Sequence, residues 1–347
     1  WNFFVPPQYA GTISGLADGP NDRLITQTAS NTNAFGYWES PIFFVNDLIP
    51  ADEKGIRISG VAGEGSLYRS DWTIATDEVD QSKVPTVRLR ASSWDHQQSD
   101  GMMITSRGPF APTTADKEYT QLFTQPEGQN RFRLDLDVLN FDDQNSVVAE
   151  IYLDRVEVTF IGEDSLGTPS QVSSMDFTGG NDNGFTSRTG PPLAEPVSFQ
   201  STDDGLAIRG ADEPSTETIF GYFGNETTMP FDSNLVYKIT WSVSSDATAE
   251  EQLQVPAFRL GVNDSDLQFA AAKHVESFQE TARIPVAGAT EDYVGWIYTP
   301  DEIDGNTWIL SFDYLSPNLS NRGVPHPSQD DPTITLFLEA INIESFA

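Results

Sequence analysis

An internal repeat is the feature of this 347-residue sequence that most constrains its fold. Residues 67–77 match residues 236–246, with tyrosine, tryptophan and aspartate at the same positions in both copies. Four further pairs of blocks recur in the same order: 35–38 with 220–223, 81–90 with 252–261, 134–139 with 310–315, and 151–158 with 336–343. This order predicts two related domains that arose by internal duplication, 1–165 and 166–347, with a Gly- and Pro-containing junction at 162–170.

The repeated blocks have the pattern of β-strands. In residues 132–138, 151–160 and 235–243, apolar and polar residues alternate, which is typical of a strand with one buried face. Turn-forming clusters separate these blocks, and the 26 Gly and 22 Pro of the whole chain leave little room for long helices. The sequence therefore predicts an all-β protein in which each repeat forms an antiparallel β-sandwich.

Composition excludes several classes of function. The chain has 52 acidic and 19 basic residues, and its formal charge of −33 disfavours binding to nucleic acid. Cysteine is absent, and the three histidines lie far apart, which excludes disulfide scaffolds, thiol catalysis and the common zinc motifs. No apolar run is long enough to span a membrane. An Asp-rich, Lys-poor and Cys-free composition favours an extracytoplasmic location, that is, secreted, periplasmic or on a cell surface.

Each repeat contains short motifs of a known class of domain. An early Tyr-x-x-x-Trp strand occurs at Tyr68–Trp72 and Tyr237–Trp241, and Tyr152–Val156 has the closing-strand order aromatic, aliphatic, acidic, any residue, aliphatic. With these motifs, each repeat resembles the jelly-roll β-sandwich of galactose-binding-like domains and many carbohydrate-binding modules. The resemblance implies two tandem jelly-roll-like antiparallel β-sandwich domains. It also implies a structural calcium near the acidic residue of the closing strand, Asp154, whose counterpart in the second copy is Glu339.

Acidic turns offer further ligands for calcium, which prefers six to eight oxygen atoms. Asp142 and Asp143 stand in one such turn, and we expect Asp176 to join Glu339 if the ends of the second domain meet. The alternative for each cluster is an acidic turn that is open to solvent. Calcium is the one cofactor that the sequence suggests.

Aromatic residues are candidates for a sugar-binding site, because the C–H faces of a pyranose stack on aromatic rings. Trp94 follows a predicted strand and has polar neighbours, which makes it the first candidate ligand-binding residue. Tyr37 and Trp38 form a second candidate, although their recurrence in the other copy favours a structural role. Trp72 and Trp241 lie within alternating patterns, which predicts that they pack in the core.

The sequence indicates a non-catalytic protein, since it has no nucleophile motif of the GxSxG type and no nucleotide-binding fingerprint. The first hypothesis is a structural or accessory subunit that acts through protein contacts or self-assembly in a surface or membrane-associated assembly. The alternative is a carbohydrate-binding module, which should present one to three aromatic side chains beside polar ones on a sheet or cleft.

The apolar N-terminal segment favours the assembly hypothesis. Trp1, Phe3 and Phe4 are its candidate contacts with a partner, because exposed apolar residues need a cover. The cover can equally be the first sandwich of the protein itself. Pro6 and Pro7 restrict any strand pairing of this segment to an edge or an end of a sheet.

Overall fold

The structure is a computed structural model of the full chain. It describes residues 1–17, 23–29, 34–40, 43–44, 56–59, 67–93, 103–124, 131–140, 148–189, 198–209, 220–225, 232, 234–248, 257–264, 274–278, 287–298, 308–315 and 334–347. The chain forms two compact units, one of Trp1–Asp95 with Ser106–Ser165, the other of Leu166–Ala347 with His96–Thr105. Its main division falls between Ser165 and Leu166. Within the ranges given above, no helix is both long enough and apolar enough to cross a membrane.

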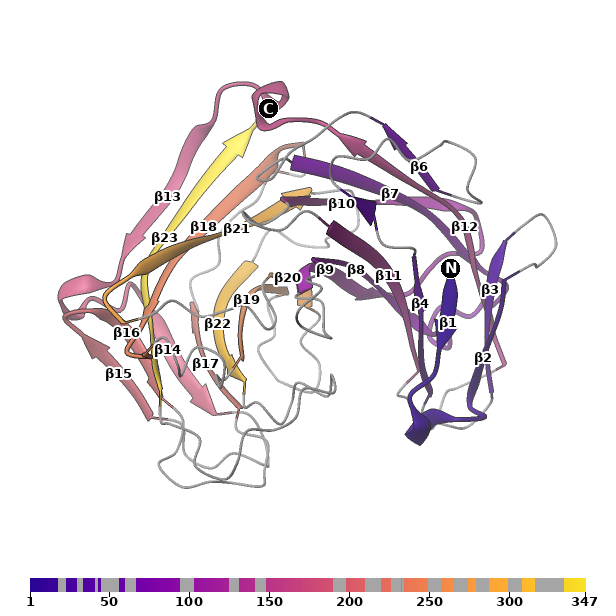
Figure 1. The fold of residues 1–347 in the computed structure, drawn as a ribbon, viewed down its shortest axis with the longest axis horizontal. Helices are drawn as coiled ribbons and strands as arrows, with labels where there is room; N and C mark the ends of the chain where they lie inside the picture. Colours follow the sequence, from indigo (N-terminus) through magenta and orange to yellow (C-terminus); the bar gives the residue numbers. More distant parts are fainter. Residues whose placement is uncertain are drawn as a thin grey trace. The chain divides into compact units, whose positions relative to one another are not determined.

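The first unit contains two sheets (Figure 1). One has the order β1-β4-β11-β8-β9, formed by Asn2–Phe4, Ala34–Glu39, Arg131–Asn140, Thr86–Ser93 and Met103–Phe110. The other has the order β10-β7-β12-β3-β2, formed by Lys117–Thr124, Leu67–Thr76, Glu150–Phe160, Leu24–Thr28 and Ile13–Leu16. The short strand β5 (Phe43–Phe44) pairs with β11, and β6 (Ile56–Ser59) runs parallel to β12.

The second unit repeats this arrangement. One sheet has the order β20-β19-β22-β17-β14, formed by His274–Phe278, Ala257–Asp264, Trp308–Leu315, Phe220–Asn225 and Phe185–Thr189. The other has the order β15-β16-β23-β18-β21, formed by Ser198–Thr202, Gly205–Arg209, Thr335–Phe346, Val236–Ser245 and Thr290–Tyr298, with β13 (Ser170–Asp176) paired to β23.

The five sequence blocks that recur occupy equivalent strands in the two units. The equivalent pairs are β4 and β17, β7 and β18, β8 and β19, β11 and β22, and β12 and β23. The order of strands along the main path of each sheet matches as well, whereas β6 runs parallel to β12 and β13 runs antiparallel to β23. The predicted fold class, two tandem antiparallel β-sandwiches, is therefore confirmed.

The closing strand of each unit, β12 in the first and β23 in the second, has a bulge at the same place. The register between β12 and β7 skips Asp154, and the register between β23 and β18 skips Glu339. A bulge turns an extra side chain to one face and breaks the alternation of the strand. The two acidic residues that the repeat aligns are therefore the two bulge residues.

Each unit has its own apolar core, centred on the repeated tryptophan. Trp72 and Trp241 are completely buried, as the alternating pattern predicted. The indole N–H of Trp72 donates to Ser70 Oγ at 3.0 Å, so its polar atom is satisfied within the core. Leu153 and Val158 pack in the core of the first unit, and Leu338 and Ile343 occupy the corresponding strand of the second.

The N-terminal segment belongs to the first sandwich. β1 pairs with β4 at the end of its sheet, and Pro6 and Pro7 follow it, in agreement with the predicted edge position. The ring of Phe3 packs on Trp38 with 4.9 Å between centroids, in a space that Gly15 and Gly36 leave open. A Cβ atom at either glycine would come closer than 3.0 Å to that ring.

Two of the predicted partner contacts, Trp1 and Phe3, are half-buried and pack on aromatic rings of the first unit, and their contact with a partner stays a prediction. Trp1 packs edge-on against the buried Trp72, with 6.1 Å between ring centroids. Trp1, just before β1, and Phe3 within it alternate with Asn2 and Phe4, so both rings point to the core side of the sheet. Of the three aromatic residues, Phe4 alone faces outward, and 41% of its surface is exposed.

Candidate functional site

The candidate site is the outward face of β1, β4, β11 and β8, which we call the site face (Figure 1). Strand alternation creates it. In β11, Leu134, Leu136 and Val138 point into the core between the two sheets, so Asp135 and Asp137 point to the other face of their sheet. The residues of the site face are Phe4, Tyr37, Glu39, Arg88, Arg90, Arg133, Asp135 and Asp137.

Two rows of residues cross the site face from strand to strand. In the first row, Phe4 lies opposite Tyr37, Tyr37 opposite Asp137, and Asp137 opposite Arg88. In the second row, Glu39 lies opposite Asp135, and Asp135 opposite Arg90. Side chains opposite one another on neighbouring strands are close enough to interact.

Asp137 is the centre of the first row and is completely buried. Its Oδ2 accepts a hydrogen bond from Arg88 Nε at 2.8 Å and lies 2.6 Å from a terminal nitrogen of the same guanidinium. Its Oδ1 is ion-paired with Arg90 at 2.8 Å. Two guanidinium groups therefore compensate one buried carboxylate.

Asp135 has the same position in the second row and is also completely buried. Its Oδ1 is ion-paired with Arg133 Nε at 2.9 Å, and Oδ2 accepts a hydrogen bond from Ser92 Oγ at 3.4 Å. Arg133 also pairs with Glu39 at 2.8 Å, and the side chains of Arg133 and Glu39 are 15% and 17% exposed. Burial raises the pKa of Glu39 above its ordinary value, and the charge of Arg133 opposes this rise.

The aromatic part of the site face is a stack of three groups. The rings of Phe4 and Tyr37 lie 5.6 Å apart at an angle of 20°, and the guanidinium of Arg90 lies over the Tyr37 ring at 5.6 Å. Since β4 lies between β1 and β11, Phe4 and Arg90 approach Tyr37 from opposite sides. Burial, followed by the charge of Glu39, raises the pKa of the Tyr37 phenol, so this group is a neutral donor at physiological pH.

The second unit has the first row in part but lacks the charges of the second row. Tyr222 lies opposite Asp313, and Asp313 opposite Arg259, which matches Tyr37, Asp137 and Arg88. At the place of Phe4, however, Arg188 lies opposite Tyr222. Gly224, Ser311 and Gly261 occupy the register positions of Glu39, Asp135 and Arg90. The combination of Phe4 with a row of charges therefore distinguishes the first unit.

The two neighbouring residues that were predicted to bind ligand, Tyr37 and Trp38, lie on opposite faces of the sheet. Tyr37 lies on the site face, as a ligand-binding role requires, whereas Trp38 is 2% exposed and points into the core. The indole N–H of Trp38 donates to Thr26 Oγ1 at 2.7 Å within the sandwich. The prediction that Trp38 binds ligand is corrected, because successive residues of a strand point to opposite faces. Trp94 lies outside the described residues.

Sequence reasoning missed the charged residues of the site face, although their signal was present. Arg88 and Arg90 alternate with apolar residues in β8, and Asp135 and Asp137 do the same in β11. Each pattern predicts a strand. The opposite charges on the two strands were a signal that the strands are neighbours with their polar faces on the same side.

The candidate calcium ligands do not form one cluster. Asp154 is ion-paired with Arg23, and the guanidinium of Arg23 also donates to both carboxylate oxygens of Asp116, at 3.2 and 3.1 Å. Burial raises the pKa of Asp154, the charge of Arg23 opposes this rise, and Asp116 adds to it. A guanidinium thus lies where the resemblance places calcium, and because it would repel a second cation, the residues at Asp154 do not fit that ion.

In the second unit, Asp176 and Glu339 have separate partners. Asp176 accepts hydrogen bonds from the backbone N–H and the hydroxyl of Thr178, and these bonds lower its pKa. Glu339 accepts from Thr290 Oγ1 at 3.1 and 3.0 Å. Among the described residues, no three His, Asp or Glu side chains are grouped to hold a metal ion. Asp142 and Asp143 lie outside those residues, and calcium at that turn stays a prediction.

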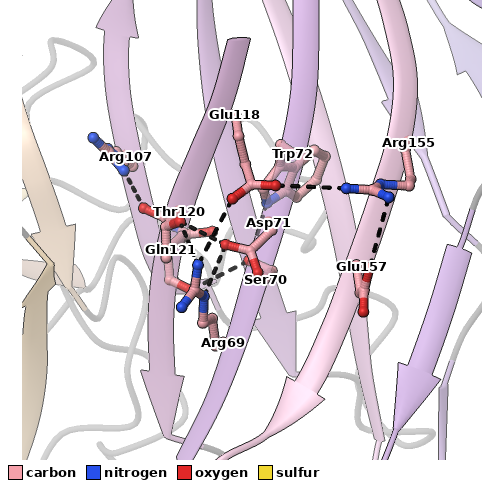
Figure 2. A network of polar contacts seen from close by, with 10 residues as sticks. All are labelled: Arg69, Ser70, Asp71, Trp72, Arg107, Glu118, Thr120, Gln121, Arg155 and Glu157. Carbon is pink, nitrogen blue, oxygen red and sulfur yellow. Dashed lines mark hydrogen bonds and ion pairs between the residues drawn. The ribbon is translucent and has the colours of Figure 1, made fainter. Parts of the chain in front are cut away.

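A second polar network covers the outward face of β7, β10 and β12 (Figure 2). Arg155 pairs with Glu118 at 3.5 Å, Glu118 with Arg69 at 3.7 Å, and Arg69 with Asp71 at 2.9 Å. The side chains of Arg155 and Glu118 are almost half exposed, at 47% and 48%. Exposed pairs of this kind contribute little stability. The aromatic residue drawn with this network, Trp72, points into the core, so the network offers no ring to a sugar.

The sequence matches no protein-family model and no curated protein. Among solved structures, the tandem CBM22-1–CBM22-2 domain of Paenibacillus barcinonensis Xyn10C is similar over 99% of this chain and 93% of its own, with 10% identity and a TM-score of 0.29. The CBM22-1 xylan-binding domain of the same protein is similar over 52% and 96%, with 17% identity and a TM-score of 0.28. TmCBM61 in complex with β-1,4-galactotriose is similar over 46% and 88%, with 9% identity and a TM-score of 0.27. These structures belong to the class of tandem and single carbohydrate-binding modules that the sequence resembles.

Proposed function

We propose that this protein binds a glycan through the site face of its first unit and has no catalytic role of its own. The observation that carries the proposal is the exposed ring of Phe4, which stacks on Tyr37 beside a fixed array of charged groups. This arrangement meets the expectation for a carbohydrate-binding module, one to three aromatic side chains next to polar ones on a sheet.

The chemistry of the site face suits a sugar ring. The apolar C–H face of a pyranose packs on an aromatic ring, while its hydroxyl groups at the edge both donate and accept hydrogen bonds. Phe4 supplies the aromatic surface. The partly exposed side chains of Arg88, Arg133 and Glu39 supply donors and an acceptor around it. The ion pairs hold these groups in place before the sugar binds, which lowers the entropic cost of binding.

The charges of the site face favour a neutral glycan. Three arginines, Arg88, Arg90 and Arg133, are balanced by the three carboxylates of Glu39, Asp135 and Asp137. Among its described residues, the site face therefore has no excess of positive charge that would attract an acidic polysaccharide. The formal charge of −33 on the whole chain repels such a polymer further.

The assembly hypothesis has weaker support than glycan binding. Trp1 and Phe3 pack on Trp72 and Trp38 of the first sandwich, which leaves less of their surface for a protein partner. Phe4 remains exposed, and the proposal assigns it to glycan binding. A neutral extracellular polysaccharide as ligand is consistent with the secreted, periplasmic or cell-surface location that the composition favours.

The experiment that tests the proposal compares neutral and acidic polysaccharides by affinity electrophoresis and isothermal titration calorimetry. We expect binding to at least one neutral polysaccharide, and a loss of about 10-fold or more in affinity in Phe4→Ala, since the ring contributes roughly 1.5–3 kcal/mol when it is covered. Val79→Ala is the matched control, because Val79 is 82% exposed outside the site face. Absence of binding to all neutral polysaccharides, or equal affinity of Phe4→Ala and Val79→Ala, would contradict the proposal.

A further inference from the structure

The side chains around the bulge of the closing strand differ between the two units. The unit that has a second carboxylate beside the bulge residue also has an arginine there. In the first unit, the bulge residue Asp154 faces Arg23, which precedes β3, and Asp116, which precedes β10. Arg23 is paired with both carboxylates, and its guanidinium lies over the Tyr152 ring at 5.3 Å. Four side chains from three segments of the chain therefore meet at one point.

The register identifies the counterparts of these residues in the second unit. Leu24 lies opposite Leu153 just as Leu206 lies opposite Leu338, so Gly205 is the counterpart of Arg23. Lys117 lies opposite Ile74 just as Glu291 lies opposite Val243, so Thr290 is the counterpart of Asp116. The bulge residue Asp154 corresponds to Glu339.

The first unit thus has both a cation, Arg23, and a second carboxylate, Asp116. The second unit has neither at the corresponding positions. Asp116 and Asp154 in close proximity would repel each other, and a guanidinium between them removes this repulsion. In the second unit, the hydroxyl of Thr290 donates to the single carboxylate of Glu339, so no cation is required there. Gly205 adopts a φ of 133°, and a Cβ atom at that position would clash with the backbone oxygen of Leu338. The second unit therefore has no room for a side chain where the first has Arg23.

From this correlation, we infer that Arg23 is a built-in cation that takes the place of a metal ion at the closing-strand bulge of the first unit. An arginine suits this role because its planar group binds carboxylates through two parallel donors and stays charged at all physiological pH values. The bulge of each unit is then stabilised without calcium, by an arginine in the first and by a hydroxyl in the second.

The test uses the melting temperature of the 347-residue chain. We expect Arg23→Gln to lower the melting temperature by about 5 °C or more, because it leaves two neighbouring carboxylates uncompensated. The control is Lys83→Gln, which removes the cation of an exposed pair with Asp80 and should change the melting temperature by about 1 °C or less. The double variant Arg23→Gln/Asp116→Thr, which introduces the threonine of the second unit, should recover at least half of the loss.

Calcium chloride and a chelator provide a second measurement on the same variants. We expect that Asp154→Asn leaves the response of the melting temperature to either reagent the same as in the wild type. Three results would overturn the inference: an Arg23→Gln effect no larger than that of Lys83→Gln, no recovery in the double variant, or a calcium-dependent rise in the wild type that Asp154→Asn abolishes.

Discussion

Replacing Asp137 with alanine is expected to destabilise the first unit by about 3–5 kcal/mol. The carboxylate is completely buried and compensates two guanidinium groups, those of Arg88 and Arg90. Its removal deprives the buried Arg90 charge of its closer described carboxylate, and the other described carboxylate, that of Asp135, lies 3.6 Å away. Removing one partner of a buried ion pair is costly because the other charged group stays desolvated and loses its compensating charge.

Chemical denaturation with circular dichroism and fluorescence measures this effect. Asp80→Ala is the control, since it also removes a carboxylate from a pair, but from an exposed pair with Lys83, and we expect little change. Asp137→Asn should fall between the two, because the amide preserves the shape of the side chain and loses only the charge. Equal stability of Asp137→Ala and Asp80→Ala would refute the account of the site face as a buried charge array.

Trp72→Ala and Trp241→Ala form the second prediction, with an expected loss of about 3–5 kcal/mol each in the unit that carries the change. Both rings are completely buried at equivalent positions of β7 and β18, so their removal leaves large cavities. Trp72 also loses its hydrogen bond to Ser70. The similar surroundings predict similar losses in the two units.

The measurement is again chemical denaturation, with Trp→Phe at each position as the control that keeps an aromatic ring. We expect the phenylalanine variants to lose less stability than the alanine variants. A loss below about 1 kcal/mol in either alanine variant would show that the ring is not a core element, because buried aromatic residues cost several times more to remove.

Most of the fold could be predicted from the sequence because the relevant signals are local. The alternation of apolar and polar residues in 132–138 and 151–160 predicted β11 and β12. The internal repeat then predicted the corresponding strand of the second unit for each of them. Even the bulges have a local signal. Leu153 and Val156 are buried three positions apart rather than two, so two polar residues stand in succession where the strand bulges.

The candidate site was less predictable because it depends on which strands are neighbours. Residue type alone predicted both Tyr37 and Trp38 as ligand-binding residues. Which of the two points to the site face depends on how the alternating side chains of β4 are oriented in the sheet. The pairing of Arg23 with Asp154 joins residues that lie far apart in the sequence, and no local pattern indicates it. The position of Phe3 in the first sandwich depends on the space beside Gly15 and Gly36, which becomes evident when β1, β2 and β4 are in place.

The most direct test of glycan binding is a crystal structure of the protein with an oligosaccharide derived from the polysaccharide that it binds. The account predicts a sugar ring packed against Phe4, with its hydroxyl groups within hydrogen-bonding distance of at least one of Arg88, Arg133 and Glu39. An oligosaccharide bound in the second unit, or near Trp94 with the site face empty, would contradict it.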